Sequence, residues 1–194
     1  MFEYRDNWYW KDTLDLKRKS YTCYNCGEKI LSEEGYSCTS SSYDSIDKGV
    51  IYICHVCKAP TYFISGYQIP ECFYGENIEH LPGDISLTYD EARKCFSVAA
   101  YTSSVLCCRK ILMNISCEKG AEEGKQFIYY VNYLSDNGYV PPNGKVWVDK
   151  IRNLGNEATH KLEVKSKEDA ELAITFTSML LKFIYEFPKL LEIK

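Results

Sequence analysis

The chain has 194 residues, of which 45% are hydrophobic, and 23 Lys and Arg against 27 Asp and Glu give a formal net charge of −4. This length accommodates one sizeable domain and a small one, and the negative balance argues against a protein that grips nucleic acid through its overall charge. The sequence has no run of about 18 apolar residues that would span a membrane, and its first residues lack the apolar core of a signal peptide. We therefore expect a cytoplasmic protein whose thiols stay reduced.

The first 20 residues are rich in aromatic and charged side chains, with Trp8, Tyr9 and Trp10 in succession. Three adjacent aromatic side chains are rarely all solvated, because burying them removes a large apolar area from water. We expect residues 1–20 to form an aromatic arm that packs on the rest of the protein. A surface patch that binds a partner is the alternative.

Two cysteine pairs with the spacing Cys-x2-Cys dominate residues 21–72. Each pair places two thiolates on one tight turn, and four thiolates are the ligand set of a closed tetrahedral zinc site. Gly27 can adopt a positive φ at the end of the first turn, and the apolar run at residues 50–53 predicts a strand before the second. We therefore predict a zinc ribbon over residues 21–72. Its expected ligands to one structural Zn²⁺ are Cys23, Cys26, Cys54 and Cys57.

Disulfides and buried free thiols are the alternatives, because the chain has 10 cysteines. The expected cytosolic setting favours metal, since thiols there stay reduced. Cys38 and Cys72 are candidates to replace a ligand, but neither has a neighbouring cysteine partner. His55 lies between two ligands and is expected to be a turn residue. Residues 21–80 carry three Lys and Arg against eight acidic residues, so the ribbon is not expected to bind phosphates.

The second half of the chain has the periodicity of helices. Residues 73–87 contain Pro82 and Gly83 and are predicted to be a linker. Beyond them, apolar residues recur every three or four positions, and the helices expected from this pattern cover about 88–117, 125–136, 145–154 and 168–186. Their short connections predict an antiparallel four-helix bundle over residues 88–188, followed by a tail at 189–194. The predicted fold class is α+β by segregation, a small β ribbon followed by helices.

Short patterns that follow one another along the helical half carry a family resemblance. They are Leu81-Pro82-x-Asp84-Ile85, Tyr89-x-Glu91-Ala92, Arg109, and Arg-x-x-Gly-Asn-x-x-x-His at residues 152–160. Together they resemble an uncharacterised bacterial domain that accompanies type I restriction subunits and phage-defence genes, and that belongs to the HEPN superfamily of all-α bundles. The resemblance covers residues 81–188 and implies a HEPN-like bundle.

The resemblance also implies a chemistry. Many HEPN proteins are metal-independent RNases that act as dimers and use an arginine followed, after a short spacer, by a histidine. Arg152 and Asn153 match the start of that motif and His160 matches its end, so Arg152 would stabilise charge on the phosphate and His160 would act as general acid or base. Seven residues separate Arg152 from His160, which is longer than the family's spacer.

Residues 144–167 carry six Lys and Arg against three acidic residues, and a polyanion is expected to meet the chain there. The residues expected to bind are Lys150, Asn156, Lys161 and Arg109, the last as an inward-reaching arginine. A structural loop, an RNase site and a surface for nucleic acid or protein all remain open for residues 151–160. The overall acidity and the long spacer favour a binding or adaptor module in bacterial or phage conflict systems, as a homodimer with an RNA or protein partner; the RNase is the alternative.

Overall fold

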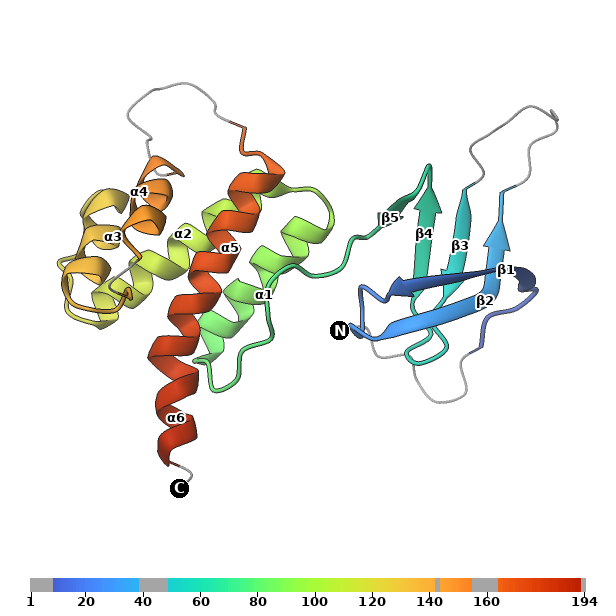
Figure 1. Cartoon of the computed structure of the whole chain (residues 1–194), viewed down its shortest axis with the longest axis horizontal. Helices are drawn as coiled ribbons and strands as arrows, with labels where there is room; N and C mark the ends of the chain where they lie inside the picture. The colour runs from blue at the N-terminus through green and yellow to red at the C-terminus, as the bar shows by residue number, and fades with distance from the viewer. Residues whose placement is uncertain (1–8, 39–48, 142–143, 155–163, 193–194) are drawn as a thin grey trace. The chain divides into compact units, whose positions relative to one another are not determined.

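The computed structural model describes residues 9–38, 49–141, 144–154 and 164–192. The chain divides into two compact units, Met1–Phe73 and Tyr74–Lys194, and each has its own hydrophobic core. An antiparallel sheet comes first and helices follow (Figure 1), so the predicted α+β arrangement is confirmed, and the helices are compatible with a bundle.

The first unit is a five-stranded antiparallel sheet in which each strand pairs with the next along the chain. Its strands are β1 (Leu14–Thr22), β2 (Lys29–Ser37), β3 (Val50–Ile53), β4 (Pro60–Ile64) and β5 (Tyr67–Ile69). Thr22 pairs with Lys29 where β1 turns into β2, and Ile53 pairs with Pro60 where β3 turns into β4. Each cysteine pair therefore lies in the six-residue turn of a hairpin.

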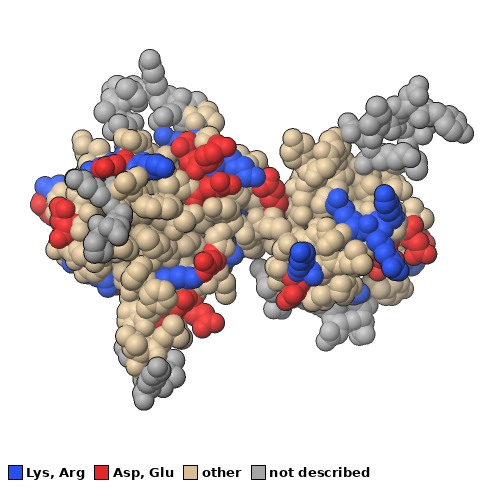
Figure 2. Space-filling view, in the orientation of Figure 1, with Lys and Arg blue, Asp and Glu red and all other residues tan. Residues whose placement is uncertain are grey.

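The arm expected over residues 1–20 is wrong from Leu14 onward, because Leu14–Thr22 is strand β1. A bulge between Asp15 and Lys19 interrupts the alternation typical of a strand, and the basic run Lys17-Arg18-Lys19 lies at this bulge. The charge expected for the ribbon was counted over residues 21–80, so it did not include these three basic residues, which belong to the sheet. A group of Lys and Arg side chains is visible on this unit in Figure 2.

Trp10 packs on the sheet, while Trp8 lies outside the described residues. The Trp10 Nε1 donates to the Lys58 carbonyl at 2.8 Å, and its ring contacts Tyr36 edge to face. Tyr9 is exposed. Of the two cluster residues that the structure describes, Trp10 is thus packed and Tyr9 is solvated.

The core of the first unit is small and aromatic. Tyr21, Tyr52 and Phe63 meet at its centre, with ring centroids 5.1 Å apart for Tyr21 and Phe63 and 5.7 Å apart for Tyr52 and Phe63. Cys23 and Cys54 belong to the same buried cluster. A core of this size gives a small sheet little stability of its own, and domains of this kind commonly need a metal or disulfides.

The second unit is helical. Its elements are α1 (Gly83–Ser97), α2 (Tyr101–Glu118), α3 (Phe127–Asp136), α4 (Lys145–Leu154), α5 (Lys167–Leu181), the π-helix η1 (Lys182–Glu186) and α6 (Phe187–Glu192). Helix α2 contacts α1, α3 and α5 and is central to the unit. Helix α5 begins with a reciprocal cap: Ser166 Oγ accepts from the Asp169 N–H, and Asp169 Oδ2 accepts from the Ser166 N–H.

Three boundaries expected for the helical half are wrong. The single helix at 88–117 is two helices, because Ala99 adopts a φ of +60° and the chain turns between α1 and α2. The linker at 73–87 ends earlier, since Pro82 caps α1 and the helix begins at Gly83. The tail at 189–194 is helical up to Glu192. At Ala99 and at the C-terminal tail no glycine marks the boundary, whereas Pro82 and Gly83 indicated a linker and instead begin a helix.

Candidate metal centre

The four cysteines of the two hairpin turns converge. Their Sγ atoms all lie within 4.8 Å of one another, with 3.6 Å between Cys23 and Cys57 and 3.8 Å between Cys26 and Cys54. A tetrahedral zinc site with Zn–S bonds of about 2.3 Å requires sulfur atoms roughly 3.8 Å apart. The positions of the thiols therefore fit a single Zn²⁺ coordinated by both turns.

The two turns repeat one backbone pattern. In the first, the Gly27 N–H donates to the Cys23 carbonyl and the Cys23 N–H to the Glu28 carbonyl, both at 2.9 Å. In the second, the Lys58 and Cys54 N–H groups make the equivalent bonds to Cys54 and Ala59. These bonds direct both thiols of each turn to the same side, which is how a short sequence motif builds half a site.

Burial and hydrogen bonds shift the pKa of the Cys23, Cys26 and Cys57 thiols. Cys23 and Cys54 are fully buried, and burial raises the pKa of the Cys23 and Cys26 thiols. At Cys57 burial acts in the same direction, but hydrogen bonds from the Asn25 side chain and the Ala59 backbone outweigh it and leave the pKa of Cys57 below its usual value. A metal that binds here must displace thiol protons.

The donor set identifies the kind of metal that fits. Four thiolates select zinc over magnesium or calcium, and four protein ligands leave no open position for a substrate, as in structural sites. Cys38 and Cys72 are not part of the group; the Cys72 thiol donates instead to the Thr22 carbonyl at 3.1 Å. Within the described part of the chain this is the one cluster of metal-binding side chains.

Arg152, the first residue of the expected RNase motif, is held by two neighbours. Its Nε donates to Asn132 Oδ1 on α3 at 2.6 Å, and a terminal nitrogen donates to Asp149 Oδ1 at 2.7 Å. Neither partner was predicted from the sequence, although an acid three residues before an arginine on a helix is a recognisable pair. Asn153 and Lys150 are exposed on the same helix.

The other half of that motif is not described. His160, Asn156 and Lys161 lie outside the described residues, and their proximity to Arg152 stays a prediction. Arg109 reaches inward from α2 and is 9% exposed. Its guanidinium lies 4.6 Å from the centre of the Phe127 ring, a cation–π contact typical of a structural arginine.

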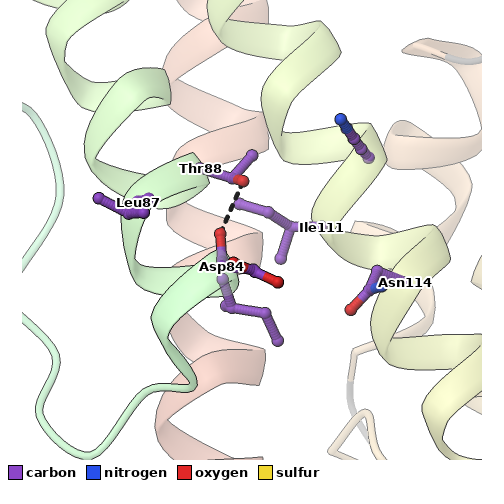
Figure 3. A pocket seen from close by; sticks show the side chains of 7 residues that line it. Asp84, Leu87, Thr88, Ile111 and Asn114 are labelled. Atoms are coloured by element: carbon purple, nitrogen blue, oxygen red, sulfur yellow. Dashed lines mark hydrogen bonds between the residues drawn. The ribbon is translucent and has the colours of Figure 1, made fainter.

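A surface hollow of about 380 Å³ lies between α1 and α2 (Figure 3). Asp84 and Thr88 line it from α1, where Thr88 Oγ1 donates to the Asp84 carbonyl at 2.8 Å, and Ile111 and Asn114 line it from α2. No residue predicted as a site residue lines this hollow.

Among the helices that the structure describes, none is long and apolar enough to cross a membrane.

Comparison with known proteins identifies the helical half. Residues 90–193 match the model of a family described as Domain of unknown function (DUF4145). Neither a curated protein nor a solved structure matches the chain. The match begins within α1 and extends through α6, and it covers more than half of the sequence. On this evidence the chain belongs to the DUF4145 family.

Proposed function

We propose that the protein is a zinc-containing binding or adaptor module of the cytoplasm. In this proposal Zn²⁺ stabilises a ribbon-like sheet, and a HEPN-like helical unit accompanies it in a bacterial or phage conflict system. The observation that carries the proposal is the closed set of four sulfur atoms at tetrahedral spacing. A metal with four protein ligands stabilises a fold and performs no reaction, so it is the folded surface that would act.

The metal is tested by elemental analysis of the purified protein. We expect about one zinc per chain, and Cys26→Ser and Cys54→Ser should each lower the zinc content sharply. Cys38→Ser is the matched control, because Cys38 is exposed and outside the cluster. Wild-type protein without zinc, or with a Cys23–Cys26 disulfide, would contradict the proposal.

Nucleic acid is one ligand class that the proposal includes. Lys17 on β1 and Lys150 on α4 are both exposed, and cations of this kind neutralise phosphates. Fluorescence anisotropy with single-stranded RNA and duplex DNA at two salt concentrations tests this. We expect Lys17→Glu or Lys150→Glu to weaken binding and reduce its salt dependence. If the wild-type protein binds neither polymer, the surface serves a protein partner.

A metal-independent RNase is the second candidate, favoured by the partly exposed position of Arg152 in the basic segment. Against it stands the Asp149 carboxylate, with which a phosphate would have to compete for the Arg152 guanidinium. If the protein is an RNase, Arg152→Ala and His160→Ala each lower cleavage by a factor on the order of 100 or more. Asp149→Asn separates the roles: an arginine that acts on phosphate retains activity in this variant, because only its competing carboxylate is lost. RNA that stays intact with wild-type protein excludes this candidate.

A homodimer is also part of the proposal. The tyrosines of α3 are poor support for it, because Tyr130 is buried and the Tyr129 and Tyr133 hydroxyls bond to the backbone of the preceding loop. Better support comes from η1 and α6, where Phe183, Phe187, Leu190 and Leu191 are exposed and the first two border a hollow of about 450 Å³. Light scattering should give twice the chain mass, and Phe187→Glu should return it to one chain.

A further inference from the structure

Asn25, the third residue of the first cysteine turn, has a buried polar side chain. It is 5% exposed, and its Nδ2 lies 3.4 Å from Sγ of Cys57 in the second turn. A thiolate is an acceptor, so the amide presents its donor to the sulfur. This hydrogen bond joins the two hairpins through a side chain, independently of the ion that the sulfur atoms would share.

The equivalent position of the second turn has no such residue. Aligned on their cysteines, Cys23-Tyr24-Asn25-Cys26 and Cys54-His55-Val56-Cys57 place Val56 opposite Asn25. Val56 is 55% exposed, although the two turns share the same backbone hydrogen bonds. The asymmetry therefore lies in the side chain and not in the backbone that carries it.

A site of four thiolates, two of them on buried and two on half-buried cysteines, gains from donors of this kind. Zn²⁺ with four thiolates carries a net charge of about −2, and a buried charge is unfavourable unless it is paired or hydrogen-bonded. Groups that hydrogen-bond to metal ligands orient them and tune their basicity, so that losing one weakens metal binding. The Asn25 side chain is placed to do both for the sulfur of Cys57.

We infer that Asn25 is a positioning residue of the metal centre: its side-chain N–H holds Sγ of Cys57 in the ligand geometry and offsets part of the negative charge of the four thiolates. The inference rests on the zinc site proposed above. It assigns to Asn25 a role that packing alone does not require, since a side chain of similar size without a donor would fill the same space.

The experiment is a Co²⁺ titration of the full-length protein, followed by Zn²⁺ competition. Binding is read from the sulfur-to-cobalt charge-transfer band. Asn25→Leu removes the donor at similar size, and Asn25→Asp replaces it with a carboxylate of the same shape. Both should lower the affinity by about 10- to 100-fold, with the larger loss in Asn25→Asp, and shift the band. Val56→Asp is the matched control: it adds the same charge at the equivalent, exposed position and should bind almost as the wild type does.

Wild-type affinity in Asn25→Leu overturns the inference, since the donor would then be dispensable. Equal losses in Asn25→Asp and Val56→Asp overturn it as well, because they indicate a general effect of charge. Circular dichroism of the metal-bound variants verifies that the sheet is intact. If the wild-type protein shows no charge-transfer band, the metal site itself is refuted. This result differs from the one that overturns only the role of Asn25, in which the wild type and Asn25→Leu both bind cobalt normally.

Discussion

Lys58 adopts a backbone conformation that suits glycine better. Its φ is +61°, and Gly27, at the equivalent place in the first turn, has a φ of +76°. A residue with a Cβ in this region is less stable by roughly 1–2 kcal/mol. The turn imposes the conformation, because the Lys58 N–H donates to the Cys54 carbonyl and the Lys58 carbonyl accepts from Trp10.

Lys58→Gly should therefore stabilise the metal-bound sheet. We expect a gain of about 0.5–1 kcal/mol in the free energy of unfolding, because relief of the backbone strain exceeds the greater entropy that glycine has in the unfolded chain. Denaturant unfolding of the zinc-loaded protein, followed by a signal from the sheet, measures it. Gly27→Ala is the inverse control: a Cβ there meets no atom within 4 Å, so a loss of about 1 kcal/mol would arise from φ alone. No loss in that variant would contradict the argument.

At the scale of elements, the ends of the helices decide how the second unit is built. Helix α1 ends in a turn in which the Ala99 and Ala100 N–H groups donate to the Phe96 and Cys95 carbonyls. Helix α5 begins with the reciprocal bonds of Ser166 and Asp169. The first end satisfies carbonyls through two backbone N–H groups and through Ser97 Oγ, which donates to the Lys94 carbonyl at 2.8 Å. The second depends on two side chains and is therefore sensitive to substitution.

Ser166→Ala should destabilise the helical unit by about 1 kcal/mol, because the Asp169 N–H loses its acceptor. Thermal unfolding followed at a helical wavelength should show a melting temperature roughly 4 °C lower. Ser103→Ala is the matched control, since Ser103 is an exposed residue within α2 and alanine is a better helix former. Equal melting temperatures for Ser166→Ala and wild type would refute the role of the cap.

For the whole molecule, the two units should respond differently to loss of metal. Chelation should unfold Met1–Phe73, because metal-binding free energy contributes directly to the stability of a sheet with a small core. The helices of Tyr74–Lys194 should persist, since this unit has a core of its own. NMR spectra before and after chelation measure this. Simultaneous loss of helical and sheet resonances would show that the units do not fold separately.

Zinc affinity should rise with pH. Burial raises the pKa of Cys23 and Cys26, so both thiols hold their protons near neutral pH in the metal-free protein. Because each proton must leave before the sulfur binds, a higher pH reduces the competition from protons and strengthens binding. Calorimetry in buffers of different ionisation enthalpy measures the protons released. An affinity unchanged between about pH 6 and about pH 8 would argue against thiolate ligands.

Local patterns were predictable and long-range contacts were not. The spacing of Cys23 to Cys57 predicted a shared cluster, because a short turn fixes the direction of both its thiols. The break at Ala99 was missed, since nothing in its neighbourhood distinguishes it from helix. The contact of Arg152 with Asn132 was also missed, because it depends on the packing of α4 against α3. Strand β1 was not predicted, because its bulge and its three basic residues interrupt the alternation of apolar and polar side chains that is typical of a strand.

The order of the strands has a consequence for how the sheet forms. Every strand pairs with its neighbour along the chain, so each hairpin can close over a short loop and without waiting for distant segments. The four thiols, in contrast, come from two hairpins, β1–β2 and β3–β4, which meet only when β2 pairs with β3, and closing that longer loop has a larger entropic cost. Hairpin closure should thus be fast and insensitive to zinc, and the rate at which the ion is captured should set the time that a newly made chain needs to reach its final state.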